Sequence, residues 1–154
     1  MSTNPIPEDY RATPYLICKN ASEALNWYSR AFNAKEIVRL ADDSGKVMHA
    51  EIRIGFSPIM LADEFMDMGY KSPDTIGGSP VLILVYVENI DETYARAIKL
   101  GAKKITDVAD QFDGDRRGNL VDPYGHVWIL ASRQENISNS DMKLRFEKIM
   151  KSES

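Results

Sequence analysis

Cysteine is almost absent from this chain of 154 residues. Its single cysteine, Cys18, cannot form an internal disulfide, so we expect a protein that folds without cross-links in a reducing cytoplasm. The residues after Met1 are polar and include prolines, without the apolar core of a secretory signal. No apolar run approaches the roughly 20 residues that a membrane-spanning helix needs. These absences predict a soluble, cytoplasmic protein with no membrane partner.

Basic residues are not in excess either. The formal net charge is −4, whereas nucleic-acid binding normally requires a basic face. The 44% of hydrophobic residues is typical of a globular protein, and the length suits about one domain with its own core. The composition therefore argues against a nucleic-acid partner and leaves the function to be inferred from motifs.

The chain repeats one order of strands and helices. Asn20 with Glu23, and Asn89 with Glu92, form matching helix-start signatures 69 residues apart. A β-prone segment precedes each expected helix and further strand-like segments follow it. An internal repeat of a mixed unit predicts two half-sheets that share one concave face. The predicted fold class is α+β: tandem βαβββ modules that form a cup-shaped mixed sheet, plus a C-terminal helix.

The repeat divides the chain into five segments. We expect an N-terminal arm at 1–10, modules at 11–64 and 80–134 that together form one domain at 11–134, a linker at 65–79, and a C-terminal helical tail at 135–154. In the tail, apolar residues from Met142 to Met150 follow a helical spacing. That stripe is expected to be buried, either on its own domain or across a dimer.

Seven short motifs occur in a characteristic order. They are Thr13-Pro-Tyr-Leu16, Trp27-Tyr28, Phe32-Asn33-Ala34, Gly45-Lys-Val-Met-His-Ala-Glu51, Gly77-Gly-Ser-Pro80, Asp110-Gln-Phe-x-Gly-Asp-Arg116 and Asp122-Pro-Tyr-Gly-His126. Through them, residues 11–133 resemble the vicinal oxygen chelate (VOC) superfamily, which has the glyoxalase/bleomycin resistance protein/dioxygenase fold. The resemblance is greatest to the PhnB-like branch, and it includes the tail motif at 142–146.

The resemblance implies a fold and often a homodimer, but no single activity. The superfamily includes glyoxalase I, extradiol dioxygenases, fosfomycin resistance enzymes, epimerases and metal-free proteins that sequester drugs. In metal-dependent members, the ligands come from one position on the first and last strands of each module. The resemblance places these positions at Thr13, Met60, Leu82 and Ile129. A divalent ion needs imidazole or carboxylate donors, so we expect no metal at these positions and predict no cofactor.

Strand alternation assigns side chains to the two faces of the sheets. Residues that share a face with the four positions above should line the cup, and the opposite face should pack on the helices. On the third strand, the apolar set from Met48 to Ile54 is expected to face the helices, which places the polar set over the cup. The predicted ligand-binding residues of this cup are Tyr15, Arg53, Met60, Leu82, Tyr86 and Ile129. Trp128 and Cys18 have the parity of core residues.

His49 and Glu51 are the candidate catalytic residues. They lie two apart on one strand face, where a histidine and a carboxylate can act as an acid/base pair. Alternatively, they form a solvated sheet edge or an ion pair with Arg53. An unusual metal site with His126 is a further alternative, although His126 more simply caps the turn that starts at Asp122.

Arg116 and Arg117 are candidate ligand-binding residues in an expected hairpin. Arginines can hold an anionic substrate through paired hydrogen bonds. The simpler interpretation is a charged hairpin with no ligand.

Three functions remain open at this point. The first is a PhnB-like protein that takes a small, partly apolar ligand in the cup without the usual divalent metal, either as a binding protein or as a metal-independent enzyme. The second is a metal-dependent lyase, isomerase or dioxygenase with unusual ligands. The third is a non-catalytic interaction module whose cup is filled by side chains.

Overall fold

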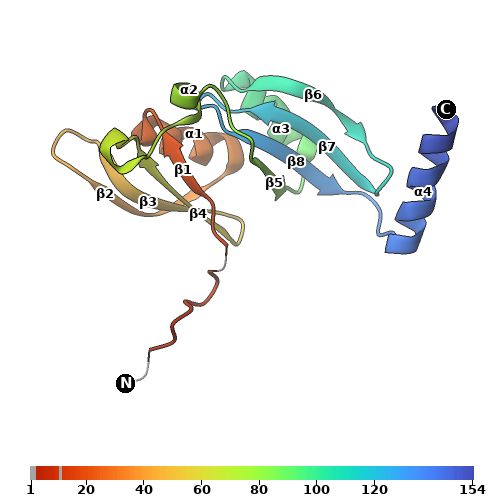
Figure 1. Ribbon diagram of the computed structural model, residues 1–154, viewed down its shortest axis with the longest axis horizontal. Helices are drawn as coiled ribbons and strands as arrows, with labels where there is room; N and C mark the ends of the chain where they lie inside the picture. Colours follow the sequence, from red (N-terminus) through yellow and green to blue (C-terminus); the bar gives the residue numbers. More distant parts are fainter. Residues whose placement is uncertain (1–2, 11) are drawn as a thin grey trace. The chain divides into compact units, whose positions relative to one another are not determined.

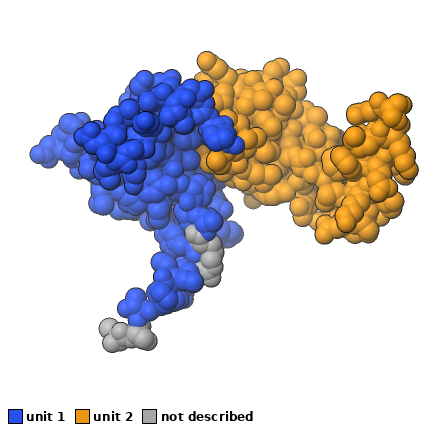
Figure 2. Space-filling view, in the orientation of Figure 1, with its two compact units in different colours: residues 1–80, 123–126 blue, residues 81–122, 127–154 orange. Residues whose placement is uncertain are grey.

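The computed structural model describes residues 3–10 and 12–154. Met1 and Ser2 of the expected arm, and Arg11 at the expected start of the domain, lie outside the described residues. The chain forms two compact units, shown in different colours in Figure 2. Unit 1 consists of Met1–Pro80 with Pro123–His126, and unit 2 consists of Val81–Asp122 with Val127–Ser154.

Unit 1 contains one βαβββ module (Figure 1). Its elements are β1 (Tyr15–Cys18), α1 (Ala21–Phe32), β2 (Lys35–Ala41), β3 (Val47–Ile54), β4 (Ser57–Asp63), the 3₁₀ helix η1 (Met66–Met68) and the short helix α2 (Pro73–Ile76). The strands form a sheet in the order β1-β4-β3-β2, with β1 parallel to β4 and the other pairs antiparallel. Helix α1 contacts all four strands.

Unit 2 repeats this module. Its elements are β5 (Leu82–Tyr86), α3 (Ile90–Lys99), β6 (Lys103–Asp110), β7 (Asp115–Val121), β8 (Val127–Arg133) and α4 (Asn139–Ser152). The sheet order β5-β8-β7-β6 matches that of unit 1, with β5 parallel to β8. The predicted α+β class, the duplicated βαβββ module and the C-terminal helix are therefore confirmed.

The expected helix starts and ends follow from local side-chain chemistry. The side chain of Asn20 accepts a hydrogen bond from the Glu23 backbone N–H at 3.2 Å, and Asn89 does the same for Glu92 at 3.2 Å. Asn33 adopts the left-handed conformation, with φ of 56°, directly after α1. Asparagine tolerates this conformation better than most residues, which explains why the helix stops there.

The helix-facing sides of both sheets are mainly apolar, with Arg39 and Arg116 as charged exceptions that reach α1 and α3. Buried residues alternate over part of β4 and of β8, and Trp128 and Cys18 are both fully buried. Met48 is an exception, because its side chain is 49% exposed while Val47 is fully buried. The pairing of β2 with β3 shifts register between Leu40 and Ala41, opposite this point, and the shift ends the simple alternation.

Residues 65–79, predicted as a linker, contain η1 and α2. Glu64 anchors them, since its carboxylate accepts hydrogen bonds from the Ser72 backbone N–H at 2.8 Å and from the Thr75 hydroxyl. These donors lower the pKa of Glu64 to about 2. In α4, Phe146, Ile149 and Met150 of the apolar stripe are exposed on the single chain, and Phe146 contacts Phe112 at a ring distance of 5.8 Å. Burial of this stripe across a dimer stays a prediction.

A buried carboxylate joins three elements of unit 1. Asp63, at the end of β4, accepts hydrogen bonds from the Ala21 N–H at the start of α1 (2.8 Å) and from the Val47 N–H at the start of β3 (2.7 Å). The matching position of unit 2 is Ser132, whose hydroxyl accepts from the Ile90 N–H at the start of α3 (3.0 Å). Each module therefore ties its helix to the end of its last strand.

None of the helices in the described ranges 3–10 and 12–154 is both long enough and apolar enough to cross a membrane.

We expect Asp63→Ala to lower the free energy of unfolding by about 3 kcal/mol, because two buried N–H groups would lose their acceptor. Urea denaturation measures this change. Asp43→Ala, at an exposed aspartate between β2 and β3, is the control and should change stability by less than about 0.5 kcal/mol. Equal effects of the two substitutions would show that the Asp63 hydrogen bonds contribute no net stability.

Candidate functional site

The open face of the unit 1 sheet, opposite α1, carries five of the ten predicted site residues. Tyr15 of β1 pairs with Met60 of β4, which in turn pairs with Glu51 of β3. These three side chains therefore form a row across the sheet. His49 and Arg53 lie on either side of Glu51 along β3, on the same face.

His49 pairs with a tyrosine. The Tyr15 hydroxyl lies 2.8 Å from Nδ1 of His49, and their rings are 5.6 Å apart. Tyr70 lies on the other side of Tyr15, at a ring distance of 6.2 Å. Partial burial raises the pKa of Tyr15 above its usual value. A hydroxyl next to an imidazole is an arrangement that can pass a proton to or from a ligand.

Glu51 has different partners. Its Oε1 accepts a hydrogen bond from the Tyr10 hydroxyl at 2.5 Å and forms an ion pair with Nε of Arg53 at 3.3 Å. The side chain is only 7% exposed, so the carboxylate needs these contacts. Hydrogen bonding to Glu51 raises the pKa of Tyr10. His49 and Glu51 thus share a strand face, but the contacts found among the described residues give each its own partner.

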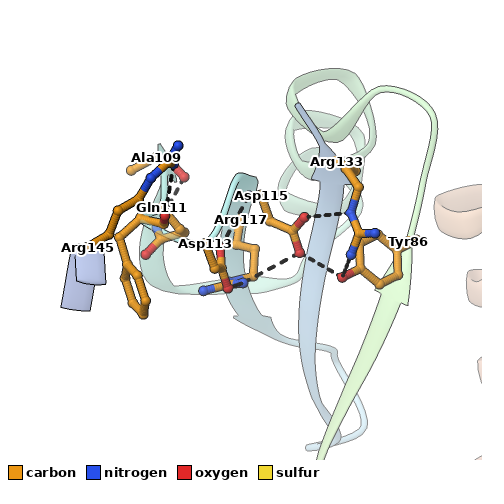
Figure 3. Close-up of polar contacts among 9 residues, drawn as sticks. Tyr86, Ala109, Gln111, Asp113, Asp115, Arg117, Arg133 and Arg145 are labelled. Atoms are coloured by element: carbon orange, nitrogen blue, oxygen red, sulfur yellow. Dashed lines mark hydrogen bonds and ion pairs between the residues drawn. The ribbon is translucent and has the colours of Figure 1, made fainter. Parts of the chain in front are cut away.

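The open face of unit 2 has a second polar cluster, centred on Asp115 (Figure 3). Asp115 is 4% exposed, and its carboxylate accepts a hydrogen bond from the Tyr86 hydroxyl at 2.7 Å. Arg133 and Arg117 pair with the same carboxylate at 3.4 and 3.5 Å. Arg117 also pairs with Asp113 at 2.5 Å. The cluster balances two carboxylates with two guanidinium groups, so both arginines already have anionic partners.

The structure separates the two arginines that were predicted to act together. Arg117 points to the open face, whereas Arg116 points to the side of α3 and pairs with Asp91 at 2.9 Å and Asp110 at 3.0 Å. Consecutive residues of a strand lie on opposite faces, which makes a shared grip on one ligand geometrically unfavourable. The two carboxylates raise the pKa of Arg116 and hold it in a charged hairpin on the helix side.

Apolar side chains adjoin the Asp115 cluster on β5. Leu82, Leu84 and Tyr86 are 48%, 44% and 51% exposed. Ile129 lies beside Leu84 in the parallel β5–β8 pair and is partly exposed. Unit 2 therefore presents an apolar strip next to a polar cluster.

The four positions that the resemblance assigned to metal ligands do not suit a metal. Thr13, Met60, Leu82 and Ile129 supply one hydroxyl, one thioether and two hydrocarbon side chains. Divalent ions prefer imidazole, carboxylate or thiolate donors. Across residues 3–10 and 12–154, no three histidine, cysteine, aspartate or glutamate side chains form a group that could hold a metal ion.

His126 lies in the interior of unit 1 rather than on an open face. It is 8% exposed, and its Nε2 lies 3.0 Å from the Ile17 carbonyl oxygen and 3.9 Å from Sγ of Cys18. The short Nε2 contact to a carbonyl identifies this nitrogen as the protonated one. His126 therefore anchors the 123–126 turn against β1.

Sequence reasoning missed four members of the polar clusters: Tyr10, Asp113, Asp115 and Arg133. Strand parity could have found Arg133, because it shares a face with Ile129 on β8. Tyr10 gave no such signal, since it precedes the first strand in an arm without periodicity.

Comparisons with known proteins agree with the fold. The sequence profile of the glyoxalase/bleomycin resistance protein/dioxygenase superfamily matches residues 11–130. An uncharacterised protein of Mycobacterium bovis is 36% identical over 134 residues, which are 85% of this chain and 88% of that protein.

Solved structures of the same fold include a PhnB protein from Bacillus cereus, with a TM-score of 0.64 and 20% identity over 80% of this chain and 99% of that one. The fosfomycin resistance protein FosX of Listeria monocytogenes, in complex with Mn(II) and sulfate, has a TM-score of 0.63 and 18% identity, covering 89% of this chain and 97% of that one.

We predict that Tyr86→Phe flattens the loss of stability at alkaline pH. The hydrogen bond to Asp115 raises the pKa of Tyr86. The stability that this bond adds is therefore complete below about pH 10 and is lost as the pH rises through the raised pKa. Urea unfolding from about pH 9 to 12 measures the difference. Phenylalanine keeps the ring under Arg133 and removes only the hydroxyl. Parallel stability curves for the two proteins would contradict the assignment.

Proposed function

The chain belongs to the glyoxalase/bleomycin resistance protein/dioxygenase superfamily, and from this premise we propose that it binds a small, partly apolar molecule on the open faces of its sheets, without a divalent metal at the superfamily's usual ligand positions. Small-molecule sites combine apolar surface with a few fixed polar groups. The β5 strip beside the Asp115 cluster has this composition, and so does the Tyr15, Met60 and Glu51 row of unit 1.

The observation that carries the proposal is the burial of Glu51 and Asp115 on faces without helices. At 5% and 4% exposure, each carboxylate is held by a tyrosine and by arginine. Placing charged groups in this way costs free energy, and they add little to the fold that apolar side chains would not. Fixed polar groups beside exposed apolar side chains are instead suited to orienting a ligand.

Proton transfer is the chemistry that the open faces could add to binding. The Tyr15 hydroxyl and the His49 imidazole are in hydrogen-bond contact, and both are partly exposed. A bound molecule with an acidic C–H or O–H group could exchange a proton with this pair. A metal-independent enzyme is therefore the second candidate, and it uses His49 with Tyr15 as the catalytic pair in place of His49 with Glu51.

The choice against a metal rests on the donor set. FosX of Listeria monocytogenes was solved with Mn(II), but its 18% identity to this chain supports a shared fold only. The side chains at Thr13, Met60, Leu82 and Ile129 supply neither imidazole nor carboxylate.

We expect no stoichiometric binding of Mn(II), Ni(II) or Zn(II), measured by calorimetric titration and by elemental analysis after dialysis. The physical reason is the lack of suitable donors at the four positions. His49→Ala is the control. One equivalent of metal bound by the parent protein and lost in His49→Ala would overturn the metal-free proposal in favour of an unusual site.

We also expect a thermal-shift screen of small, partly apolar molecules to contain stabilising compounds. A ligand at 100 times its dissociation constant stabilises by about 2.7 kcal/mol, which corresponds to roughly 5 °C or more in a protein of this size. Tyr86→Ala, which removes ring and hydroxyl from unit 2, should reduce the shifts of ligands bound there. A diverse library in which no compound shifts the melting temperature would favour an interaction module instead.

A further inference from the structure

The two polar clusters share one pattern of contacts. In unit 2, the Tyr86 hydroxyl donates to Asp115, Nη2 of Arg133 lies 3.4 Å from that hydroxyl, and the Arg133 guanidinium lies 5.6 Å from the centre of the Tyr86 ring. Nε of Arg133 also pairs with the same carboxylate. A phenol is thus held by a carboxylate that accepts a hydrogen bond from its hydroxyl and by a guanidinium that lies over its ring.

In unit 1 the same contacts hold Tyr10. Its hydroxyl donates to Glu51 at 2.5 Å and accepts from Nη2 of Arg53 at 3.1 Å. The Arg53 guanidinium lies 5.1 Å from the centre of the Tyr10 ring, and Nε of Arg53 pairs with Glu51. The chain therefore builds a phenol-holding pair of side chains twice, from different strands.

The two phenols differ in how the chain carries them. Tyr86 belongs to β5, which the β8 ladder fixes. Tyr10 belongs to the arm, where residues 3–9 are all exposed and form neither helix nor strand. Glu51 and Arg53, by contrast, lie on β3 between two paired strands. Glu51 and Arg53 are thus fixed by the sheet, whereas the phenol that they hold belongs to an exposed segment outside any helix or strand.

We propose that Glu51 and Arg53 form a binding site for the hydroxyaryl group of a small molecule, and that Tyr10 fills this site from the chain's own arm. The inference rests on the proposed function and specifies the ligand chemistry for unit 1. Tyr10 is then an internal competitor, and a ligand must displace it.

The contacts select for a phenol. The buried Glu51 carboxylate requires an O–H or N–H donor, and Nη2 of Arg53 requires an acceptor on the same atom. A hydroxyl satisfies both, whereas an ammonium has no free acceptor and an anionic carboxylate is repelled by Glu51. The guanidinium over the ring favours an aromatic group over an aliphatic alcohol.

The probe for this site is 4-methylphenol, which reproduces the side chain of Tyr10. We expect Tyr10→Ala to bind it with a dissociation constant of about 0.1 mM and the parent protein to bind it about tenfold more weakly, because the attached phenol competes at an effective concentration of about 1 mM. Toluene, which lacks the hydroxyl, should bind Tyr10→Ala at least about tenfold more weakly than 4-methylphenol does. Chemical-shift titration of the labelled protein measures each affinity.

Three further variants locate the site. Glu51→Gln in the Tyr10→Ala background should reduce the preference for 4-methylphenol over toluene, because a neutral amide oxygen is a weaker acceptor than a carboxylate, and circular dichroism checks its fold. If Glu51→Gln does not fold, Arg53→Lys in the same background replaces it, because lysine keeps the charge but lacks the planar guanidinium. Tyr70→Ala removes another tyrosine of unit 1 and should leave the affinity for 4-methylphenol at the parent value.

Three results would overturn the inference. The first is equal affinity of the parent and Tyr10→Ala proteins for 4-methylphenol. The second is equal affinity of Tyr10→Ala for 4-methylphenol and toluene. The third is binding of a peptide of residues 3–10 to Tyr10→Ala without binding of 4-methylphenol, since the site would then recognise the arm and not the phenol. In each case, compounds found in the thermal-shift screen would leave the proposed function intact.

Discussion

A carboxylate that leaves water must be hydrogen-bonded or neutralised, and this constraint accounts for much of the structure. Among residues 3–10 and 12–154, four acidic residues are buried: Glu51, Asp63, Asp115 and Asp122. Asp63 takes two backbone N–H groups, and Asp122 takes the indole N–H of Trp128 at 2.8 Å. These two connect elements of the fold. Glu51 and Asp115 lie on the open faces, and each requires a tyrosine and arginine instead.

Backbone and side-chain partners of a buried carboxylate differ in how readily a ligand can replace them. Backbone N–H groups are fixed by the fold, so Asp63 has the same partners as long as unit 1 is folded. Side-chain partners can be exchanged for groups of a ligand at a smaller structural cost. Tyr10 is the partner that belongs to no helix or strand, and residues 3–9 of the arm before it are exposed. The constraint that stabilises unit 1 therefore also defines where an outside hydroxyl group could bind.

The sequence was sufficient for the fold because the fold depends on local patterns. Helix caps at Asn20 and Asn89, the left-handed stop at Asn33 and the alternation in β3 and β8 are all properties of neighbouring residues. Where a longer-range register shift intervenes, as beside Met48, the pattern fails. The helices within 65–79 were missed because proline and glycine indicate turns as readily as the ends of short helices.

The site was less predictable because its contacts join residues distant in sequence. His49 meets Tyr15 only because β4 lies between their strands, and the sequence suggested Glu51 as its partner because Glu51 is two residues away. Alternation alone places Arg116 and Arg117 on opposite faces of β7, so the sequence was sufficient to argue against a grip on one ligand by both side chains. Tyr10 could not be found by any strand or helix pattern, since its contacts with Glu51 and Arg53 join residues that are far apart in the sequence. In a fold built by duplication, the repeat predicts which elements recur, but contacts such as those of Tyr10 that join the arm to a module lie outside its pattern.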